Sequence, residues 1–466
     1  MGTYTKAQLE TELTRIKNAV ASCRTAIYNK GVTTIPSNVT LAQLPTYVNM
    51  IQCSHPDIPC SYIGNSETVS SSRGDVYFDT GLKGGNNVTF DAVFCKSVSG
   101  SDGMLFGADE LHFFIPLHKN NYLFWYTNTP ANKMNWKQSG TNTFYVNKFV
   151  HYSSATNREG ASNYGVTVGS SWYSNNVIST GSVTRTTSNI YLFARNRAGT
   201  IDCKAPLGCK LRYICFFEDG NLVRFFIPVL HWINNAYTPC LYDKVNDTYH
   251  YNLGSGTPVY ATLNSYMYDY FYATANHTDI GFLSDYSIES QSNRLHTKCT
   301  LSASGYENAN EQYILCIKVD GSNKFGLFSK CAGVANSGRA GMKWRNDSST
   351  WKNLFFSATA DVPFKLSEYM NTNTVLYGNG TKYIDSTYQY SSSVVGKKMP
   401  IMGGGFVAKD NRCYYAIMSD IYRVHSYVYI PILDREDNKH YMFDLCNLVQ
   451  KGWTGTESNI EGLFLD

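Results

Sequence analysis

The first apolar pattern in the chain is a stripe with the spacing of a coiled-coil seam. Its members follow one another at intervals of 4, 3, 4, 3 and 4 residues: Leu9, Leu13, Ile16, Val20, Cys23 and Ile27. A helix that repeats apolar positions in this way keeps them on one side if it supercoils around a partner. The pattern predicts an amphipathic helix that joins copies of the chain. The mixture of residue types at the two seam positions selects neither a homodimer nor a homotrimer.

Residues on both sides of the stripe mark where this helix begins and ends. Thr5 followed by Gln8 is a capping box, and Gly31 supplies a glycine stop. A second short helix is expected to begin at Thr40. If it folds back, the stripe would be buried within one chain by the leucines of that second helix, Leu41 and Leu44.

Beyond residue 65 the pattern changes to short apolar or alternating runs, separated by clusters of Gly, Asn, Asp and Ser. Such a pattern is typical of antiparallel β-sandwiches. The clearest predicted hairpin joins residues 211–217 to residues 222–230 through Asp219 and Gly220. This pair tolerates the positive φ angles that a tight hairpin turn requires.

Comparison of the chain with itself reveals a duplication. Four segments recur in the same order at an offset of about 200 residues: Asp79–Leu82 as Asp279–Phe282, Met134–Lys137 as Met342–Arg345, Phe226–Leu230 as Tyr429–Leu433, and Leu241–Asp243 as Met442–Asp444. In the second of these pairs Trp136 recurs as Trp344, which predicts a shared structural role for the two indoles. The body is therefore predicted to contain two copies of one β-unit.

The first copy also carries a series of longer motifs: Phe78–Gly81, Tyr191–Asn196, Leu222–Pro228, Leu241–Val245 and Tyr251–Gly256. They resemble the concanavalin A-like (LamG-like) jelly-roll modules of bacteriophage virion proteins. The second copy departs from this pattern, with Gly403–Gly405 in place of Phe-Ala-Arg and with the hairpin turn rewritten as Ser419–Arg423. The N-terminal helices resemble those that open the head and tail fibre proteins of phages.

Pattern and resemblance together predict a mainly β chain, with a short N-terminal α-helical stalk followed by two tandem antiparallel jelly-roll β-sandwiches. The expected divisions are a helical oligomerisation and attachment segment at 1–52, a linker at 53–65, a first jelly roll at 66–260 and a second, degenerate jelly-roll repeat at 261–466. The linker is placed where Pro56 and Pro59 interrupt the pattern.

Composition and charge exclude several classes of partner. Only 16% of the residues are charged, the formal net charge is +4, and no Lys/Arg block occurs. We therefore expect no nucleic acid partner, because phosphates call for clustered cations. No run approaches the roughly 20 apolar residues that span a bilayer, and the N-terminus shows no secretory signal. We expect no membrane insertion, and assembly in the cytoplasm of a host bacterium.

The 13 cysteines predict free thiols and no metal cofactor. Their number is odd, and several lie inside apolar strand-like runs, as Cys215 and Cys316 do. A buried free cysteine behaves as a small hydrophobic residue. Pairs with the spacing of zinc ligands are missing from the sequence.

The acidic residues do not form a convincing catalytic pair. Glycoside hydrolysis requires two carboxyl groups that face each other across the bond, about 5–9 Å apart. The nearest approach is a cluster that we interpret as a solvated turn: Asp434, Glu436 and Asp437. Asp243 and Asp444 each follow an aromatic residue, and a turn-capping role is favoured over calcium binding. The chain is expected to have no catalytic residue and no metal site.

Glycan binding requires fewer positioned groups than glycoside hydrolysis does. An exposed aromatic ring that stacks on a sugar, together with a few amide groups, can suffice. Two aromatic pairs with nearby asparagines have that composition: Trp172 with Tyr173, and Trp125 with Tyr126. Packing in a core or between strands would use the same residues.

We therefore expect a non-enzymatic structural protein of a bacteriophage virion, namely a head fibre, a tail fibre or a baseplate adhesin. Its expected partners are further copies of itself, other capsid or tail proteins and host-surface glycans. Two alternatives stay open at this point: a polysaccharide-degrading enzyme of a phage spike, and a bacterial glycan-binding lectin.

Overall fold

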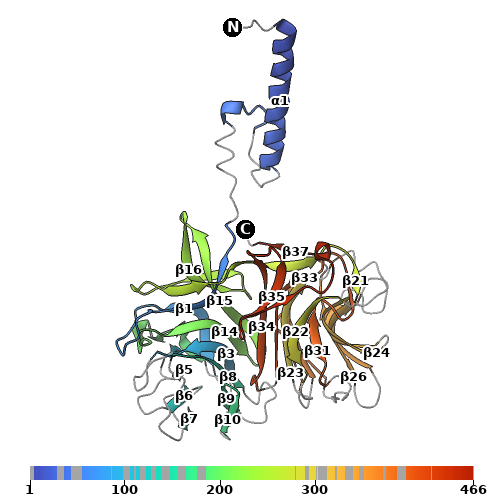
Figure 1. Ribbon diagram of the computed structural model, residues 1–466. Helices are drawn as coiled ribbons and strands as arrows, with labels where there is room; N and C mark the ends of the chain where they lie inside the picture. Colours follow the sequence, from blue (N-terminus) through green and yellow to red (C-terminus); the bar gives the residue numbers. More distant parts are fainter. Residues whose placement is uncertain are drawn as a thin grey trace. The chain divides into compact units, whose positions relative to one another are not determined.

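The computed structural model contains two compact units, an N-terminal unit that ends at His55 and a body that runs from Pro56 to Leu465 (Figure 1). The structure describes residues 5–28, 36–43, 55–85, 87–97, 105–109, 112–115, 122–126, 133–137, 147–155, 164–175, 185–278, 280–288, 293–300, 302, 312–320, 323–330, 339–345, 351–359, 361–370, 374–385, 395–420 and 422–464.

The N-terminal unit contains the predicted helix, α1 (Lys6–Tyr28). Its capping box is formed: the Thr5 amide donates to Gln8 Oε1 at 2.8 Å, and the Gln8 amide donates to Thr5 Oγ1 at 3.3 Å. Where the second helix was predicted, the described residues contain a 3-10 turn, η1 (Leu41–Gln43). Gly31 and Leu44 lie outside the described residues, so the predicted stop and half of the predicted fold-back stay untested.

The first half of the body consists of two sheets. Sheet 1 has the order β10 (Ser171–Asn175), β9 (Tyr164–Val168), β8 (Phe149–Ala155), β3 (Val88–Cys95), β14 (Lys210–Glu218), β1 (Ile58–Gly64), β15 (Asn221–Ile233), β16 (Ala236–Asp243) and β17 (Thr248–Tyr251), with β18 (Val259–Thr262) on β1. Sheet 2 has the order β13 (Thr200–Asp202), β12 (Arg195–Arg197), β4 (Phe106–Ala108), β5 (His112–Ile115), β6 (Tyr122–Tyr126) and β7 (Lys133–Lys137), with β11 (Arg185–Leu192) joining β4 to β2 (Phe78–Gly85).

The second half repeats this arrangement. Sheet 3 has the order β30 (Thr381–Asp385), β29 (Thr374–Gly378), β28 (Phe364–Met370), β23 (Asn293–Thr300), β33 (Arg412–Asp420), β34 (Ser426–Asp434), β35 (His440–Asp444) and β36 (Val449–Gly452), with β19 (Ser265–Met267), β20 (Tyr270–Ala273) and β37 (Ile460–Leu463) beside it. Sheet 4 has the order β22 (Phe282–Ser287), β31 (Lys398–Ile401), β24 (Gln312–Asp320), β25 (Asn323–Lys330), β26 (Arg339–Arg345) and β27 (Trp351–Ser357). The short strands β21 (His277–Thr278) and β32 (Phe406–Val407) pair with each other, and η5 (Glu457–Asn459) precedes β37.

The two halves share a strand order. The series β9-β8-β3-β14 recurs as β29-β28-β23-β33, and the meander β15-β16-β17 recurs as β34-β35-β36. The predicted match of Phe226–Leu230 with Tyr429–Leu433 falls on corresponding strands, β15 and β34. The described strands do not support the pairing of Trp136 with Trp344: among them β7 comes last in sheet 2, whereas β26 lies between β25 and β27. Successive strands of a meander have similar patterns, and a four-residue match cannot tell them apart.

The predicted hairpin is confirmed, and the predicted linker is corrected. Strands β14 and β15 meet at a two-residue turn in which Asp219 and Gly220 have φ angles of 50° and 92°.

Within the predicted linker 53–65, residues 58–64 form strand β1, which pairs with β14, β15 and β18. Proline was the signal for a linker, yet it is tolerated at the start of a strand. The pairing of β18 with β1 also carries sheet 1 two residues past the expected boundary at 260.

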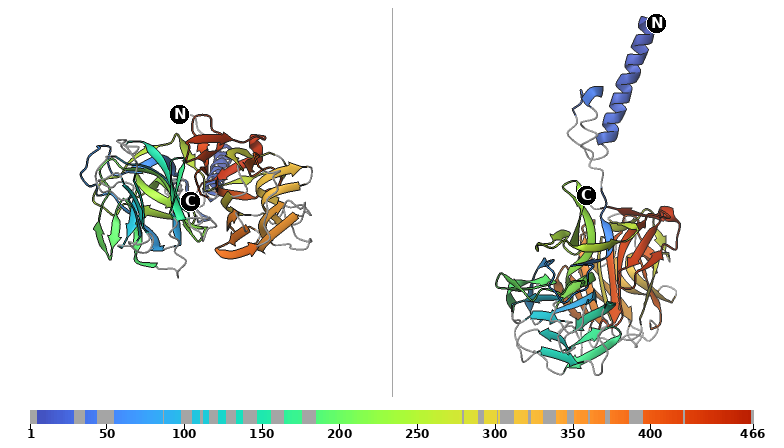
Figure 2. Two further views of the ribbon diagram at one scale, coloured as in Figure 1. Left: turned by 90° about the horizontal axis from the view of Figure 1, so that it is seen from below. Right: turned by 60° about the vertical axis from the view of Figure 1, so that its left-hand side comes forward.

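Three apolar layers alternate with the four sheets. In β14, Ile214 and Phe216 face the layer between sheets 1 and 2, whereas Tyr213, Cys215 and Phe217 face a layer shared with sheet 3. That shared layer contains apolar residues of both halves, including Ile417 and Ile430. A third layer fills the space between sheets 3 and 4. Sheets 1 and 3 therefore pack face to face, and the halves lie side by side in every view (Figures 1 and 2).

The rewritten turn of the second half fits into the first half. Arg423 is 1% exposed, its guanidinium lies 3.8 Å from the ring centroid of Phe217, and it donates to Thr89 Oγ1 at 3.2 Å and to the Ser154 carbonyl. The Ser153 hydroxyl donates back to the Arg423 carbonyl at 2.9 Å. The turn between β33 and β34 is thus a connection between the halves.

A buried carboxylate completes this connection. Asp91 accepts hydrogen bonds from Ser426 of the second half at 2.5 Å and from Tyr213 at 2.6 Å, and it lies 3.0 Å from His151 Nε2. Burial by itself would raise the pKa of Asp91, but the charge of His151 and these hydrogen bonds outweigh burial and lower it. Asp91 therefore stays ionised inside the protein.

Every cysteine that the structure describes is free, as predicted. Most of them are buried, and burial followed by the nearby charge of Asp57 raises the pKa of Cys60 to about 12. Such thiols pack as apolar side chains and are poor nucleophiles. Within the described residues, none of the helices combines the length and the apolar character needed to cross a membrane.

We predict that Arg423→Ala lowers the free energy of unfolding of the whole body by about 2–4 kcal/mol, because it leaves buried acceptors and a cavity between the halves. The matched control is Arg435→Ala, since Arg435 is exposed and stacks on Tyr266 at 5.0 Å. It should change stability by less than about 0.5 kcal/mol. Urea unfolding monitored by tryptophan fluorescence measures both values, and equal effects of the two variants would contradict the assigned role of Arg423.

Candidate functional site

The apolar stripe of α1 is exposed to solvent in the N-terminal unit. Leu9, Leu13 and Ile16 are 57%, 55% and 43% exposed. Val20 is half-buried, Cys23 is exposed, and the side chain of Ile27 lies outside those that the structure describes. Leu41, which was expected to cover the stripe if the helices folded back, is itself 61% exposed.

The remaining surface of α1 is polar and forms ion pairs within the helix. Arg15 Nε lies 2.8 Å from Glu12, and Lys6 Nζ lies 3.8 Å from Glu10. Exposed pairs of this kind contribute little to stability. By contrast, burial of one leucine side chain is worth about 1.5–3 kcal/mol. An amphipathic helix whose apolar face is uncovered gains most by packing that face against another helix.

Trp172 and Tyr173 lie on opposite faces of β10. Tyr173 packs against the core layer between sheets 1 and 2. The half-buried indole of Trp172 lies toward the second half, with its centroid 4.8 Å from the ring of Tyr422. It also lies over Gly165, where an added Cβ would come within 2.5 Å of the indole. The two rings cannot form one platform, and part of the indole surface is already in contact with protein.

Trp125 and Tyr126 lie on β6, in the middle of the meander β5-β6-β7 of sheet 2. Adjacent residues of a strand point to opposite faces, and the side chains of this pair lie outside those that the structure describes. Because β6 and β10 belong to different sheets, the structure does not bring the two aromatic pairs into one sheet. Glycan binding by these four residues stays a prediction.

The two aspartates that recur in the duplication, Asp243 and Asp444, cap equivalent turns. Asp243 Oδ1 accepts from the amides of Phe225 and Val245, each at 3.1 Å, and its other oxygen accepts from Asn246 at 2.6 Å. Asp444 accepts from the corresponding groups of the second half: the Val428 amide at 3.1 Å, the Cys446 amide at 2.9 Å and Asn447 Nδ2 at 2.6 Å. Burial raises the pKa of Asp444. In the described parts of the chain, no three His, Cys, Asp or Glu side chains gather closely enough to hold a metal ion.

The acidic cluster after β34 is a solvated turn, as the sequence indicated. The Asp434 carboxylate accepts from the Glu436 amide at 2.8 Å, and Asp437 accepts from the Lys439 amide at 3.1 Å. Hydrogen bonding to Gln450 contributes most to a lowered pKa of Asp434. These carboxylates stabilise the turn.

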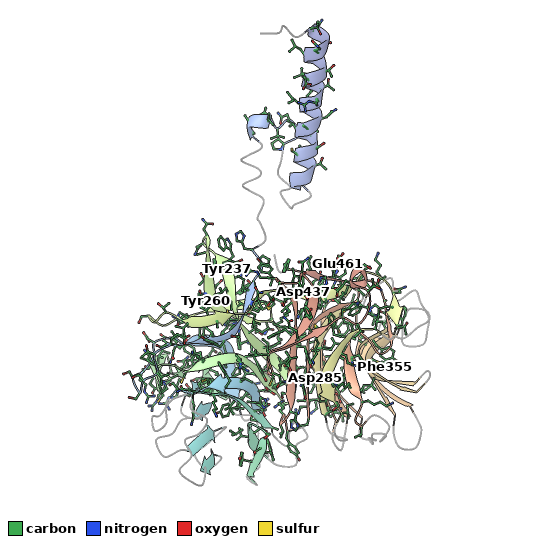
Figure 3. The ribbon with its side chains drawn as sticks, in the orientation of Figure 1. Tyr237, Tyr260, Asp285, Phe355, Asp437 and Glu461 are labelled. Carbon is green, nitrogen blue, oxygen red and sulfur yellow. The ribbon has the colours of Figure 1, made fainter. Side chains whose placement is uncertain are left out.

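A polar and aromatic cluster at the base of the β15-β16 hairpin was missed by the sequence analysis. The hairpin projects from the body, and Figure 3 labels its Tyr237. His231 stacks on Tyr249 with ring centroids 3.8 Å apart, and both bind Asp57, at 2.9 Å and 2.7 Å. Burial, followed by the charge of Asp57, raises the pKa of Tyr249 well above its usual range. The signal was obscured because Asp57 had been assigned to a linker.

We predict that Trp172→Ala lowers the free energy of unfolding by about 1–2 kcal/mol, because the contact with Tyr422 joins the two halves. Trp172→Phe is the matched control: it keeps a ring in the contact and should lose less than half of that amount. Urea unfolding measures both variants. An unchanged free energy of unfolding in Trp172→Ala would contradict a packing role for the indole. Ligand binding would then be its remaining role.

Comparison with known proteins shows distant similarities to solved structures. No family model matches the sequence, and no curated protein matches it either. Among solved structures, domains LG4-5 of the mouse laminin alpha1 chain align with 8% identity and a TM-score of 0.28, covering 88% of this chain and 94% of that one. The NanB sialidase of Streptococcus pneumoniae aligns with 10% identity and a TM-score of 0.23, covering 86% and 75%. A second NanB structure, with Optactamide, aligns with 11% identity and a TM-score of 0.23, covering 85% and 74%. These values are too low to assign the chain to a family.

Proposed function

We propose that this chain is a non-enzymatic, self-associating adhesive protein of a bacteriophage virion, acting as a head fibre, a tail fibre or a baseplate adhesin. Its N-terminal helix joins copies of the chain and attaches them to capsid or tail proteins. Its β-body holds surfaces that contact glycans of the host. Two jelly-roll modules, fused through sheets 1 and 3, form that body.

The exposed stripe of α1 is the observation that carries the proposal. Leu9, Leu13 and Ile16 lie on one side of a capped helix, and the other described residues of the N-terminal unit leave them exposed. Apolar seams at this spacing pair with seams of the same kind. A further copy of the chain supplies such a seam in perfect register.

The repeated turn caps support the jelly-roll duplication. Asp243 and Asp444 bind the same three backbone and side-chain positions in the two halves, at equivalent ends of β16 and β35. Their chemistry is structural, and the acidic turn from Asp434 to Asp437 is likewise occupied in hydrogen bonds of its own backbone. These roles favour a structural and binding protein over a glycoside hydrolase. The phage assignment rests on the sequence motifs that resemble virion modules.

We predict that Leu13→Asp combined with Ile16→Asp converts the assembled protein to a monomer, because each charge would have to be buried in the seam at a cost of several kcal/mol. Sedimentation equilibrium gives the mass in solution directly. The expected result is a dimer or trimer for the unaltered protein and a mass near 52.3 kDa for the variant.

The matched control places the same substitutions on the other side of the helix, as Thr11→Asp combined with Asn18→Asp. Both of these residues are exposed, and at 100° per residue they lie opposite the stripe. The control should keep the mass of the unaltered protein. A monomeric unaltered protein, or equal masses for both variants, would contradict self-association through α1.

A further inference from the structure

A pocket opens on the second half of the body, beside the edge where β22 and β31 pair. Its volume is about 590 Å³, within the range that small-molecule sites occupy. The wall combines aliphatic side chains, backbone of two glycines, one hydroxyl and two lysines: Ile280, Leu283, Ile317, Pro400, Gly281, Gly404, Thr454, Lys397 and Lys398. Ile280 and Gly281 belong to the repeated segment Asp279–Phe282, whereas none of the lining residues belongs to the candidate aromatic pairs.

Close backbone contacts shape the pocket. A Cβ at Gly404, which has a φ of +74°, would lie 2.1 Å from the Cys316 carbonyl oxygen, and a Cβ at Gly281 would lie 2.7 Å from that of Ile401. The Thr454 hydroxyl donates to the Gly281 carbonyl at 2.8 Å and accepts from the Gly281 amide at 3.0 Å. Glycines with so little room fix the wall in place and put peptide groups where larger side chains would otherwise stand.

An apolar platform forms one side of the mouth. Leu283 and Pro400 are direct cross-strand neighbours of β22 and β31. Leu283 is 46% exposed, although it lies in a strand whose next residue, Ser284, is fully buried. Alternation along the two strands therefore turns both aliphatic side chains outward, and one flat apolar surface results.

A row of three charges borders this platform. Asp285, labelled in Figure 3, lies 2.5 Å from Lys451 Nζ of β36 on one side and 3.5 Å from Lys398 Nζ of β31 on the other. Hydrogen bonding to Lys451 contributes most to a lowered pKa of Asp285, with a smaller part from Lys398. The carboxylate is therefore ionised at neutral pH and is matched mainly by Lys451. Lys398, whose side chain is 50% exposed, leaves the row with one net positive charge beside the platform.

We propose that this pocket binds a sugar acid, a pyranose unit that carries a carboxylate, with its apolar face on Leu283 and Pro400 and its carboxylate at Lys398. The inference rests on the proposed adhesive function and names the class of glycan that the body contacts. A pyranose ring offers one face of C–H groups for the platform and hydroxyl groups that donate to Thr454 Oγ1, whose own proton goes to the Gly281 carbonyl. The net positive row selects for a carboxylate, because a charge-assisted hydrogen bond from Lys398 to a carboxylate is stronger than one to a neutral hydroxyl.

The test compares two ligands that differ only at C6 of the sugar, methyl β-D-glucuronide and methyl β-D-glucoside. Each is titrated into the full-length protein at 50 mM salt and followed by isothermal calorimetry and by ligand-observed NMR. We expect saturable binding of the glucuronide, with an affinity about threefold to fivefold higher than that of the glucoside. A difference of this size is what one exposed charge pair contributes to binding. Higher salt should reduce this preference, since the pair is screened. Absence of glucuronide binding would overturn the proposal.

Variants then locate the site. Lys398→Glu should abolish the preference for the glucuronide, and Leu283→Asp should weaken binding of both glycosides, because it removes the platform. The control Lys148→Glu makes the same change of charge at an exposed lysine of the first half, and it should leave both affinities unchanged. Equal loss in Lys398→Glu and Lys148→Glu, or no loss in either, would overturn the pocket as the site.

The same variants separate this inference from the proposed function. If Lys398→Glu still binds host cells as tightly as the unaltered protein does, the pocket proposal fails while the adhesive function stands. If the unaltered protein binds glucuronide but is a monomer, the pocket stands while assembly through α1 fails.

Discussion

Face-to-face burial of sheets 1 and 3 is the interaction on which the rest of the body depends. A β-sandwich normally keeps one face of each sheet in water, so its strands alternate between apolar and polar residues. In β14 and β33 both faces are buried, and the side chains are apolar almost without interruption. Neither sheet could expose its shared face without placing a large apolar surface in water. The two halves therefore behave as one body, although their strand orders repeat.

This constraint explains why the second copy departs from the first. The Asp219-Gly220 turn of the first copy contacts the other half through its backbone, since the Tyr377 hydroxyl donates to the Asp219 carbonyl at 2.6 Å. The longer turn of the second copy contacts the first half through side chains: Tyr422 lies against Trp172, and Arg423 lies among Thr89, Ser154 and Phe217. The sequence of this segment differs from that of the first copy because the segment forms a buried contact with the other half. Polar anchors such as Arg423 and Asp91 also fix the register between two large apolar faces, which by themselves could slide past one another.

The sequence alone was sufficient where local chemistry decides the structure. The capping box at Thr5, the turn at Asp219 and the free buried cysteines all follow from short-range rules and are confirmed. The sequence alone was insufficient where the structure depends on contacts between residues that lie far apart in the chain. Strand β1 was taken for a linker because its pairing partners lie about 150 residues or more away, and Trp136 was matched to a strand in a different position. The pocket was missed for the same reason, since its residues Leu283, Ile317 and Pro400 come from three separate strands.

The protein thus combines a capped helix that has an uncovered apolar stripe with one fused β-body, whose pocket is lined in part by Lys397 and Lys398. The central claim is that the body is a single cooperative unit, and amide hydrogen exchange at increasing urea tests this claim most directly. Peptides from β14 and β33 should open with the same free energy and the same urea dependence, because sheets 1 and 3 can only lose their shared core together. Exchange of β33 at lower urea, while β14 stays protected, would show that the halves unfold independently and would contradict the account.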